Sequence, residues 1–150
     1  MLPEISVSVK VAVVRNGCVL LLSYDDGEFH YNLPGGKARK GEFLRAAARR
    51  KVLEETGLPV DVRRLLFVVE YVPEGWGGKY GDVQKVQFNF MATTPATGEP
   101  RFSDPVDPMQ IGFEWVPIVD LPAKYLLPQV TDRLVYSLSA DGHDVLADDW

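Results

Sequence analysis

Hydrophobic and polar positions alternate along the first part of the chain, a pattern typical of β-strands. Residues 5–14 alternate and are rich in Val, which predicts a strand with one buried face. The Arg-Asn-Gly sequence at 15–17 predicts a hairpin turn, because Asn and Gly tolerate the positive φ of tight turns. A second strand is expected at 18–23 and a loop at 24–31. Residues 32–36, Asn-Leu-Pro-Gly-Gly, predict a rigid turn.

The pattern changes to a helical one at 42–56, which is the clearest element of the chain. Three consecutive Ala residues at 46–48 favour a helix, and Gly57 is suited to the left-handed conformation that ends one. Pro59 prevents the helix from continuing. The sequence therefore predicts a helix with a defined C-terminal end at Thr56.

The rest of the chain predicts further strands and a second helix. Strands are expected at 60–72, 83–93 and 113–119, loops at 73–82 and 94–108, a helix at 125–138, and a tail at 139–150. Together these elements indicate an α/β protein with a mixed sheet and two helices. No repeat or linker interrupts them, so residues 1–150 are expected to form one domain, with 139–150 as a loosely packed C-terminal tail.

Composition and charge exclude several classes of protein. Sixteen basic and twenty-one acidic residues give a net charge of −5, which argues against binding of duplex nucleic acid. The apolar runs are too short to cross a membrane. A single cysteine, Cys18, excludes an internal disulfide, and two histidines argue against a His-rich zinc site. Because the first residues lack the features of a signal peptide, we expect a cytoplasmic protein.

The predicted helix at 42–56 combines apolar residues and carboxylates on one face. With Phe43 at the origin and roughly 100° per residue, Ala47 and Ala48 fall in a sector that faces the core. Glu54 and Glu55 fall in the same sector, two to three turns later. Since an amphipathic helix ordinarily keeps one character along a face, these carboxylates are expected to be paired or to hold a cation.

Carboxylates without neighbouring His or Cys favour a hard divalent ion such as Mg²⁺. Seven basic residues lie close to them in the sequence, namely Lys37, Arg39, Lys40, Arg45, Arg49, Arg50 and Lys51. Acids that hold a metal beside bases that meet phosphate oxygens indicate phosphoryl chemistry. The alternative is a solvated helix with ordinary ion pairs, for example Arg50 with Glu54 at i,i+4.

Residues 36–58 resemble the Nudix box of the MutT-like Nudix hydrolases, written G-x5-E-x7-R-E-U-x-E-E-x-G-U with U apolar. Eight of the nine positions match, namely Gly36, Glu42, Arg50, Val52, Glu54, Glu55, Gly57 and Leu58. The Leu-Pro-Gly-Gly sequence at 33–36 and the order of the flanking strands also resemble the family. The resemblance implies the Nudix fold, an α/β/α sandwich around a mixed β-sheet.

The resemblance also implies a metal site and a reaction. Mg²⁺ or Mn²⁺ would be held by the Gly36 carbonyl and the carboxylates of Glu54 and Glu55, with Glu42 supporting the site. Arg50 would orient the acidic cluster, and Lys37 would meet a phosphate. Family members hydrolyse a nucleoside diphosphate linked to another group, by attack of metal-activated water on phosphorus. The expected partner is a nucleotide-type small molecule, and a homodimer is one possible assembly.

Position 51 departs from the Nudix box, because Lys51 stands where family members carry a Glu that is commonly a metal ligand or the general base. The Lys51 ammonium is placed to pair with Glu54 at i,i+3 and with Glu55 at i,i+4. The exchange raises the local charge by two units, which should weaken the binding of a divalent ion. Two hypotheses follow: a pyrophosphohydrolase whose base lies outside the box, or a Nudix-fold module that binds or senses a nucleotide with weak or no turnover.

Several acids outside the box are candidates for the base, namely Glu70, Glu74, Asp82, Glu99 and Glu114. Glu74 and Asp82 flank a glycine-rich segment that also carries Trp76 and Tyr80, whose rings could stack on a nucleobase. The sequence does not rank these acids. It also does not separate nucleoside triphosphates, ADP-ribose, dinucleoside polyphosphates and nucleotide sugars as substrates.

Overall fold

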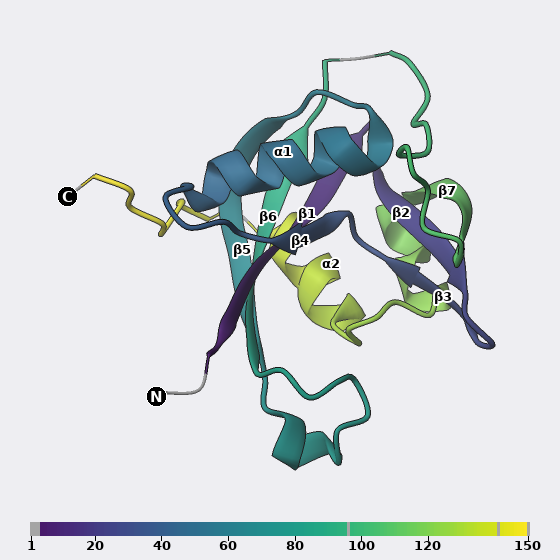
Figure 1. Ribbon diagram of the computed structural model, residues 1–150. Coiled ribbons are helices and arrows are strands. Elements are labelled where there is room, and N and C mark those ends of the chain that lie inside the picture. The colour runs from purple at the N-terminus through teal and green to yellow at the C-terminus, as the bar shows by residue number, and fades with distance from the viewer. Residues whose placement is uncertain (1–3, 96, 141, 150) are drawn as a thin grey trace.

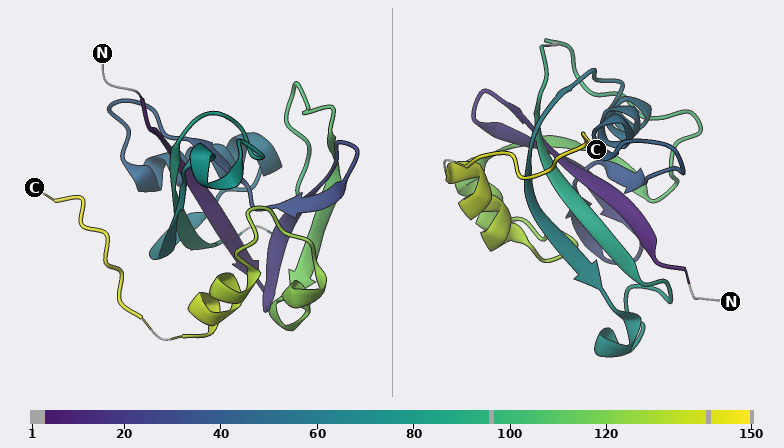
Figure 2. Two further views of the ribbon diagram at one scale, coloured as in Figure 1. Left: turned by 90° about the horizontal axis from the view of Figure 1, so that it is seen from below. Right: turned by 90° about the vertical axis from the view of Figure 1, so that its left-hand side faces the viewer.

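A seven-stranded mixed sheet lies between two helices in the computed structural model, so the expected α/β/α sandwich is observed (Figures 1 and 2). The structure describes residues 4–95, 97–140 and 142–149. The start of the expected N-terminal segment (1–3), position 96 of the expected loop, and positions 141 and 150 of the expected tail lie outside the described residues.

The elements follow one another in the order that the sequence predicts, with two additional short strands. They are β1 (Ser6–Arg15), β2 (Cys18–Asp25), β3 (Phe29–Asn32), β4 (Gly35–Lys37), α1 (Leu44–Thr56), β5 (Asp61–Tyr71), the 3₁₀ turn η1 (Pro73–Trp76), β6 (Lys85–Thr93), β7 (Gln110–Pro117), the 3₁₀ turn η2 (Ile118–Ala123) and α2 (Thr131–Ser139).

The predicted hairpin between β1 and β2 is confirmed. Asn16 and Gly17 adopt φ of 52° and 74°, the left-handed values that this turn requires. Beyond the hairpin the two strands part, and β2 continues between β3 and β7. The edge of β1 that faces β2 at the hairpin is occupied by β4 at Ser8–Lys10, while β6 runs parallel to β1 along the opposite edge.

Strand β4 was expected as part of a turn at 32–36, and the structure shows an extended segment paired with β1 instead. Glycine makes this pairing possible, because a Cβ on Gly35 would lie 2.1 Å from the Val9 carbonyl oxygen. A short strand of two glycines and one lysine carries no hydrophobic alternation, so the sequence pattern could not indicate it. Its pairing fixes Gly35 and Gly36, called the glycine turn after the Leu-Pro-Gly-Gly sequence although their backbone is extended, between β1 and α1.

Helix α1 packs on β1 through small side chains. Ala47, Ala48 and Val52 are fully buried against a core that includes Val9 and Val11 of β1. Such small residues let the helix axis come close to the sheet.

The expected helix start at Glu42 is wrong. Phe43 has extended backbone (φ −65°, ψ 147°) and a side chain that is 65% exposed, so the helix begins at Leu44. The predicted placement on the core-facing sector of the helix is right for Glu55, which is half-buried, and wrong for Glu54, which is exposed.

Three further boundaries differ from expectation. The segment expected as a loop at 24–31 contains β3, because Gly27 (φ 104°) turns the chain back so that Phe29–Asn32 pairs with β2. Strand β7 starts at Gln110 rather than at 113. Helix α2 starts at Thr131 rather than at 125, since Pro128 is incompatible with the interior of a helix.

The C-terminal tail has no regular structure and is mostly exposed over 142–149. It is nevertheless attached to the rest of the protein at Asp144, which forms an ion pair with Arg45 of α1. The Leu146 carbonyl accepts a second bond from Arg45 at 3.3 Å, and the Leu146 side chain packs against the α1 core. In the described part of the chain, no helix is long and apolar enough to cross a bilayer.

Candidate active site

The end of α1 lies against the glycine turn and brings a carboxylate to it. Glu55 Oε1 accepts a hydrogen bond of 2.7 Å from the Gly35 N–H. Burial raises the pKa of Glu55, although this N–H and the positive charges of Lys51 and Lys10 act in the opposite direction. A half-buried carboxylate with one hydrogen bond is a group for which a further cation is favourable.

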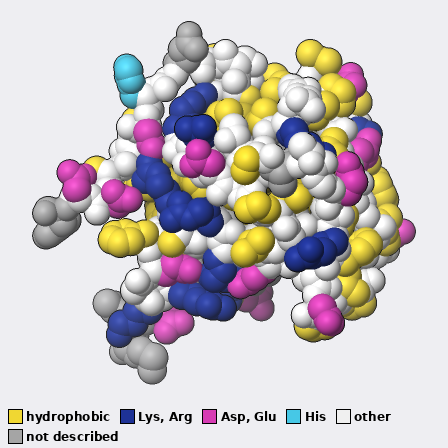
Figure 3. All heavy atoms as spheres, turned by 90° about the horizontal axis from the view of Figure 1, so that it is seen from above, with side chains coloured by type: hydrophobic (Ala, Val, Ile, Leu, Met, Phe, Trp, Pro, Cys, Tyr) yellow, Lys and Arg dark blue, Asp and Glu magenta, His cyan; other side chains and the backbone are white. Residues whose placement is uncertain are grey.

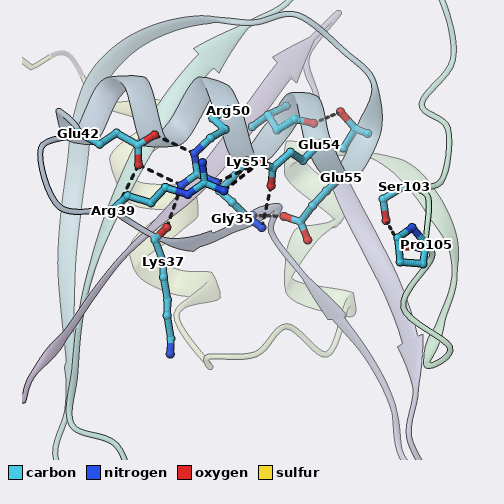
Figure 4. A network of polar contacts seen from close by, with 12 residues as sticks. Gly35, Lys37, Arg39, Glu42, Arg50, Lys51, Glu54, Glu55, Ser103 and Pro105 are labelled. Carbon is cyan, nitrogen blue, oxygen red and sulfur yellow. Dashed lines mark hydrogen bonds and ion pairs between the residues drawn. The ribbon is translucent and has the colours of Figure 1, made fainter.

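Arg50 connects α1 with the segment that precedes it. Its Nε lies 2.7 Å from Glu42 Oε2, and its Nη2 lies 3.0 Å from Glu42 Oε1, a two-pronged ion pair (Figure 4). Nη2 also donates to the Lys37 carbonyl at 3.0 Å, and Nη1 donates to Glu54 Oε1 at 3.1 Å. Arg50 therefore contacts two of the three box carboxylates, Glu42 and Glu54.

Glu42→Gln is expected to reduce the loss of stability in acid. The paired Arg50 holds the pKa of Glu42 at about 2, below its ordinary 4.5. The folded state is therefore stabilised above pH 4.5, and this contribution is lost as the pH falls from 4.5 toward 2. Urea unfolding at several pH values should show a smaller decrease in unfolding free energy for the variant over that range. Glu74→Gln, at an exposed carboxylate, is the control and should follow the wild type; equal slopes for all three proteins would contradict the assignment.

Lys51 lies directly over the glycine turn. Its Nζ is 3.3 Å from Glu54 Oε2, and a Cβ on Gly36 would lie 2.4 Å from its Cε. Of the two ion pairs expected for Lys51, the one with Glu54 is present, while Glu55 is influenced by the ammonium without a close contact. The residue that departs from the Nudix box thus lies among the box carboxylates.

The remaining basic residues of the segment 37–51 differ in their placement. Lys37 is exposed, and Figure 4 shows its side chain pointing away from the carboxylates. Arg39 lies 4.0 Å from Glu54, whereas Lys40 and Arg49 are exposed and lie outside this network. Figure 3 looks onto the α1 side, where basic and acidic side chains lie interspersed.

Two cavities adjoin the site. One of about 950 Å³ is lined by Lys37 and Glu42 and by the start of β1. The other, of about 570 Å³, is lined by Lys10, Lys85 and the aromatic rings of Trp76 and Tyr80. This second cavity is called the lysine cavity below.

Lys10 links the lysine cavity to the glycine turn. Its Nζ donates to the Leu33 carbonyl at 3.3 Å, and burial lowers its pKa, an effect opposed by the charge of Glu55. The sequence pattern does not single out Lys10. Its signal was a basic residue within the apolar alternation of 5–14, but its position depends on β4, which the pattern did not indicate.

The candidate bases lie in four different places. Glu70 lines the lysine cavity, Glu74 and Asp82 line the larger one, and Glu99 lies 3.6 Å from Arg15. Glu114 accepts hydrogen bonds from Lys124 at 2.9 Å and from the Tyr31 hydroxyl at 2.7 Å. These two contacts lower the pKa of Glu114 and engage both its oxygens, whereas Glu70 shares a cavity with Lys10.

A sheet between helices, with a carboxylate-bearing helix against a glycine turn, is the arrangement of the Nudix proteins. The NUDIX domain family matches residues 5–137, and the chain therefore belongs to this family. Nudix hydrolases act on pyrophosphate bonds and generally use divalent metal ions.

Individual relatives agree with this assignment. An oxidized purine nucleoside triphosphate hydrolase from Danio rerio is 28% identical over 144 residues, covering 92% of this chain and 88% of the relative. A MutT NUDIX hydrolase structure from Burkholderia pseudomallei is 26% identical with a TM-score of 0.70, covering 91% of this chain and 99% of that one. A NUDIX hydrolase structure from Nitrosomonas europaea shares the fold at 19% identity and a TM-score of 0.71, over 90% of this chain and 88% of that one.

Proposed function

We propose that this protein hydrolyses a pyrophosphate bond in a nucleoside diphosphate derivative, with Mg²⁺ or Mn²⁺ as cofactor. The observation that carries the proposal is the contact between Glu55 and the Gly35 N–H, which brings the end of the box helix against the glycine turn. Membership of the Nudix family supports the same reaction class.

The oxygen donors at the turn suit Mg²⁺. Among the described residues, no three His, Cys, Asp or Glu side chains are grouped so as to hold an ion on their own. This fits Mg²⁺, which is usually bound by one or two carboxylates together with substrate phosphates. Glu54, Glu55 and the Gly36 carbonyl would hold the ion. Glu42 would support the site indirectly, because it pairs with Arg50, which also contacts Glu54. When bound, such an ion lowers the pKa of water and offsets phosphate charge.

The chain's own groups supply the remaining parts of a hydrolytic site. The Gly35 N–H fixes the orientation of Glu55, and Arg50 fixes Glu54. Glu70, in the lysine cavity, is the acid outside the box that we propose as the base. Trp76 and Tyr80 line the same cavity and present aromatic surface to a nucleobase.

One observation favours a second function. The Lys51–Glu54 ion pair places an ammonium where a box carboxylate would lie, which weakens the attraction for a divalent ion. On this ground the second candidate is a Nudix-fold module that binds or senses a nucleotide with little turnover. Both candidates take a nucleotide-type ligand. A homodimer, a cytoplasmic location and the lack of duplex nucleic acid as a partner remain predictions.

The test is product release from a panel of substrates with Mg²⁺ and with Mn²⁺. The panel contains nucleoside triphosphates, ADP-ribose, a dinucleoside polyphosphate and a nucleotide sugar. It also contains an oxidised purine nucleoside triphosphate, because the relative from Danio rerio is named for hydrolysis of that class of compound. Turnover that stops when the metal is chelated supports the hydrolase. Binding of a substrate without turnover under all conditions would contradict the hydrolase and support the binding module.

A further inference from the structure

Cationic side chains lie among the carboxylates at the glycine turn and match them in number. Arg39, Arg50 and Lys51 lie among Glu42, Glu54 and Glu55, and the amino group of Lys10, whose pKa is lowered by burial, adjoins them. A Glu at position 51 would leave two guanidinium groups against four carboxylates. The side chain at this one position therefore decides whether the net charge that an entering ligand meets is negative.

This sign matters because a diphosphate is a multiply charged anion. When carboxylates are in excess, a diphosphate is repelled until a cation is added. Where cationic groups balance the carboxylates, the phosphate oxygens can instead form charge-assisted hydrogen bonds directly with a free ammonium donor. The cluster in this chain is of the second kind.

The ammonium of Lys51 is held in place and has donors to spare. An ammonium has three N–H donors, and the bond to Glu54 Oε2 uses one of them. The stem of the side chain packs across Gly36, where no Cβ intervenes, so the group is fixed beside the turn. Its side chain remains 22% exposed, which leaves it accessible to a ligand.

The lysine cavity extends this positive region away from the turn. Lys10 donates to the Leu33 carbonyl just before the turn, and Lys10 and Lys85 both line the cavity. Gln87 lines it too, and its buried side-chain oxygen has no hydrogen-bond partner in the described structure. Such an oxygen can accept a bond from a sugar hydroxyl or a base amine, so the cavity suits a nucleotide better than inorganic pyrophosphate.

We propose that this site binds the diphosphate of a nucleotide without a divalent cation, with Lys51 supplying the positive charge at the glycine turn. The inference rests on the proposed nucleotide-type ligand. It separates binding of the ligand from its turnover, whereas in a site that holds the phosphates through a metal both events depend on the divalent ion. Binding of the ligand depends on Lys51, and the divalent ion is needed for turnover.

Isothermal titration calorimetry of the full chain with ADP in excess EDTA tests this. Wild-type protein should bind ADP, and Lys51→Gln should bind it at least tenfold more weakly. Arg49→Gln is the matched control, because it removes the same charge from an exposed position of the same helix. It should bind like the wild type. Lys51→Glu should bind ADP only after Mg²⁺ is added.

Two further arms make the outcome independent of how the variants fold. The affinity of the wild type for ADP in EDTA should fall severalfold between 50 and 300 mM salt, because charged contacts are screened by salt. Inorganic pyrophosphate should bind more weakly than ADP, and equal affinity would overturn the nucleotide part of the proposal. Wild-type binding that requires Mg²⁺, or unchanged affinity in folded Lys51→Gln, would overturn the role of Lys51. Binding in EDTA without turnover in the substrate panel would uphold this inference while the hydrolase proposal fails.

Discussion

Replacement of Glu55 by Gln is expected to lower kcat by roughly 10²–10³-fold without loss of the fold. The amide oxygen of Gln can still accept the Gly35 N–H bond, so the contact between α1 and the glycine turn is retained. What the variant loses is the negative charge that we propose to hold the divalent ion. Steady-state kinetics with saturating Mg²⁺ and a metal titration measure the effect.

Thermal unfolding gives a second readout for Glu55→Gln. Because burial raises the pKa of Glu55 in the folded protein, its charged form destabilises the fold at neutral pH, and stability is gained as the pH falls. The variant should therefore melt at pH 7 at the same temperature as the wild type or higher. Glu28→Gln is the matched control, because Glu28 is exposed and is not a candidate base, and it should keep its turnover. Unchanged kcat in a folded Glu55→Gln protein would remove Glu55 from the proposed site.

Lys51→Glu is expected to raise kcat with Mg²⁺ by at least about tenfold and to lower the Mg²⁺ concentration needed for half-maximal rate. The exchange removes the ammonium that pairs with Glu54 and adds a third carboxylate beside Glu54 and Glu55. Because the local charge falls by two units, a divalent ion is attracted more strongly. Turnover measured over a Mg²⁺ titration tests this directly.

The control for this exchange is Arg49→Glu, which makes the same change of charge on the exposed side of α1. It should leave both the rate and the Mg²⁺ requirement close to those of the wild type. If Arg49→Glu and Lys51→Glu raise the rate equally, the effect is one of overall charge. If neither changes it, Lys51 does not limit catalysis in this protein.

The main elements of the fold were predictable because their signals are local. Alternation along 5–14 and the Asn-Gly turn identify the β1–β2 hairpin, and Gly57 marks the end of α1, where its φ is 72°. The loop predicted at 24–31 is wrong in part, because β3 has charged and aromatic residues around it and no hydrophobic alternation that would indicate a strand. Polarity near a turn predicts a loop, but the strand forms because β2 offers it an edge.

The candidate site was predictable along the helix and unpredictable across the sheet. Arg50 and Glu54 are four residues apart, so helix geometry alone brings them together. Lys10 and Glu55 are separated by forty-four intervening positions, and they approach only because β4 pairs with β1 beneath the end of α1. A contact of this kind depends on tertiary pairing, for which the local sequence contains no periodic signal.

The attachment of the C-terminal tail has a practical consequence for handling the protein. Arg45 of α1 forms ion pairs with Asp144 and with Asp148, the latter at 3.7 Å. Proteolysis of this tail, or a purification tag that displaces it, would thus remove these ion pairs from the helix that carries Glu54 and Glu55. Samples for kinetic work should be checked for an intact C-terminus by mass spectrometry, and an affinity tag is better placed at the other end of the chain.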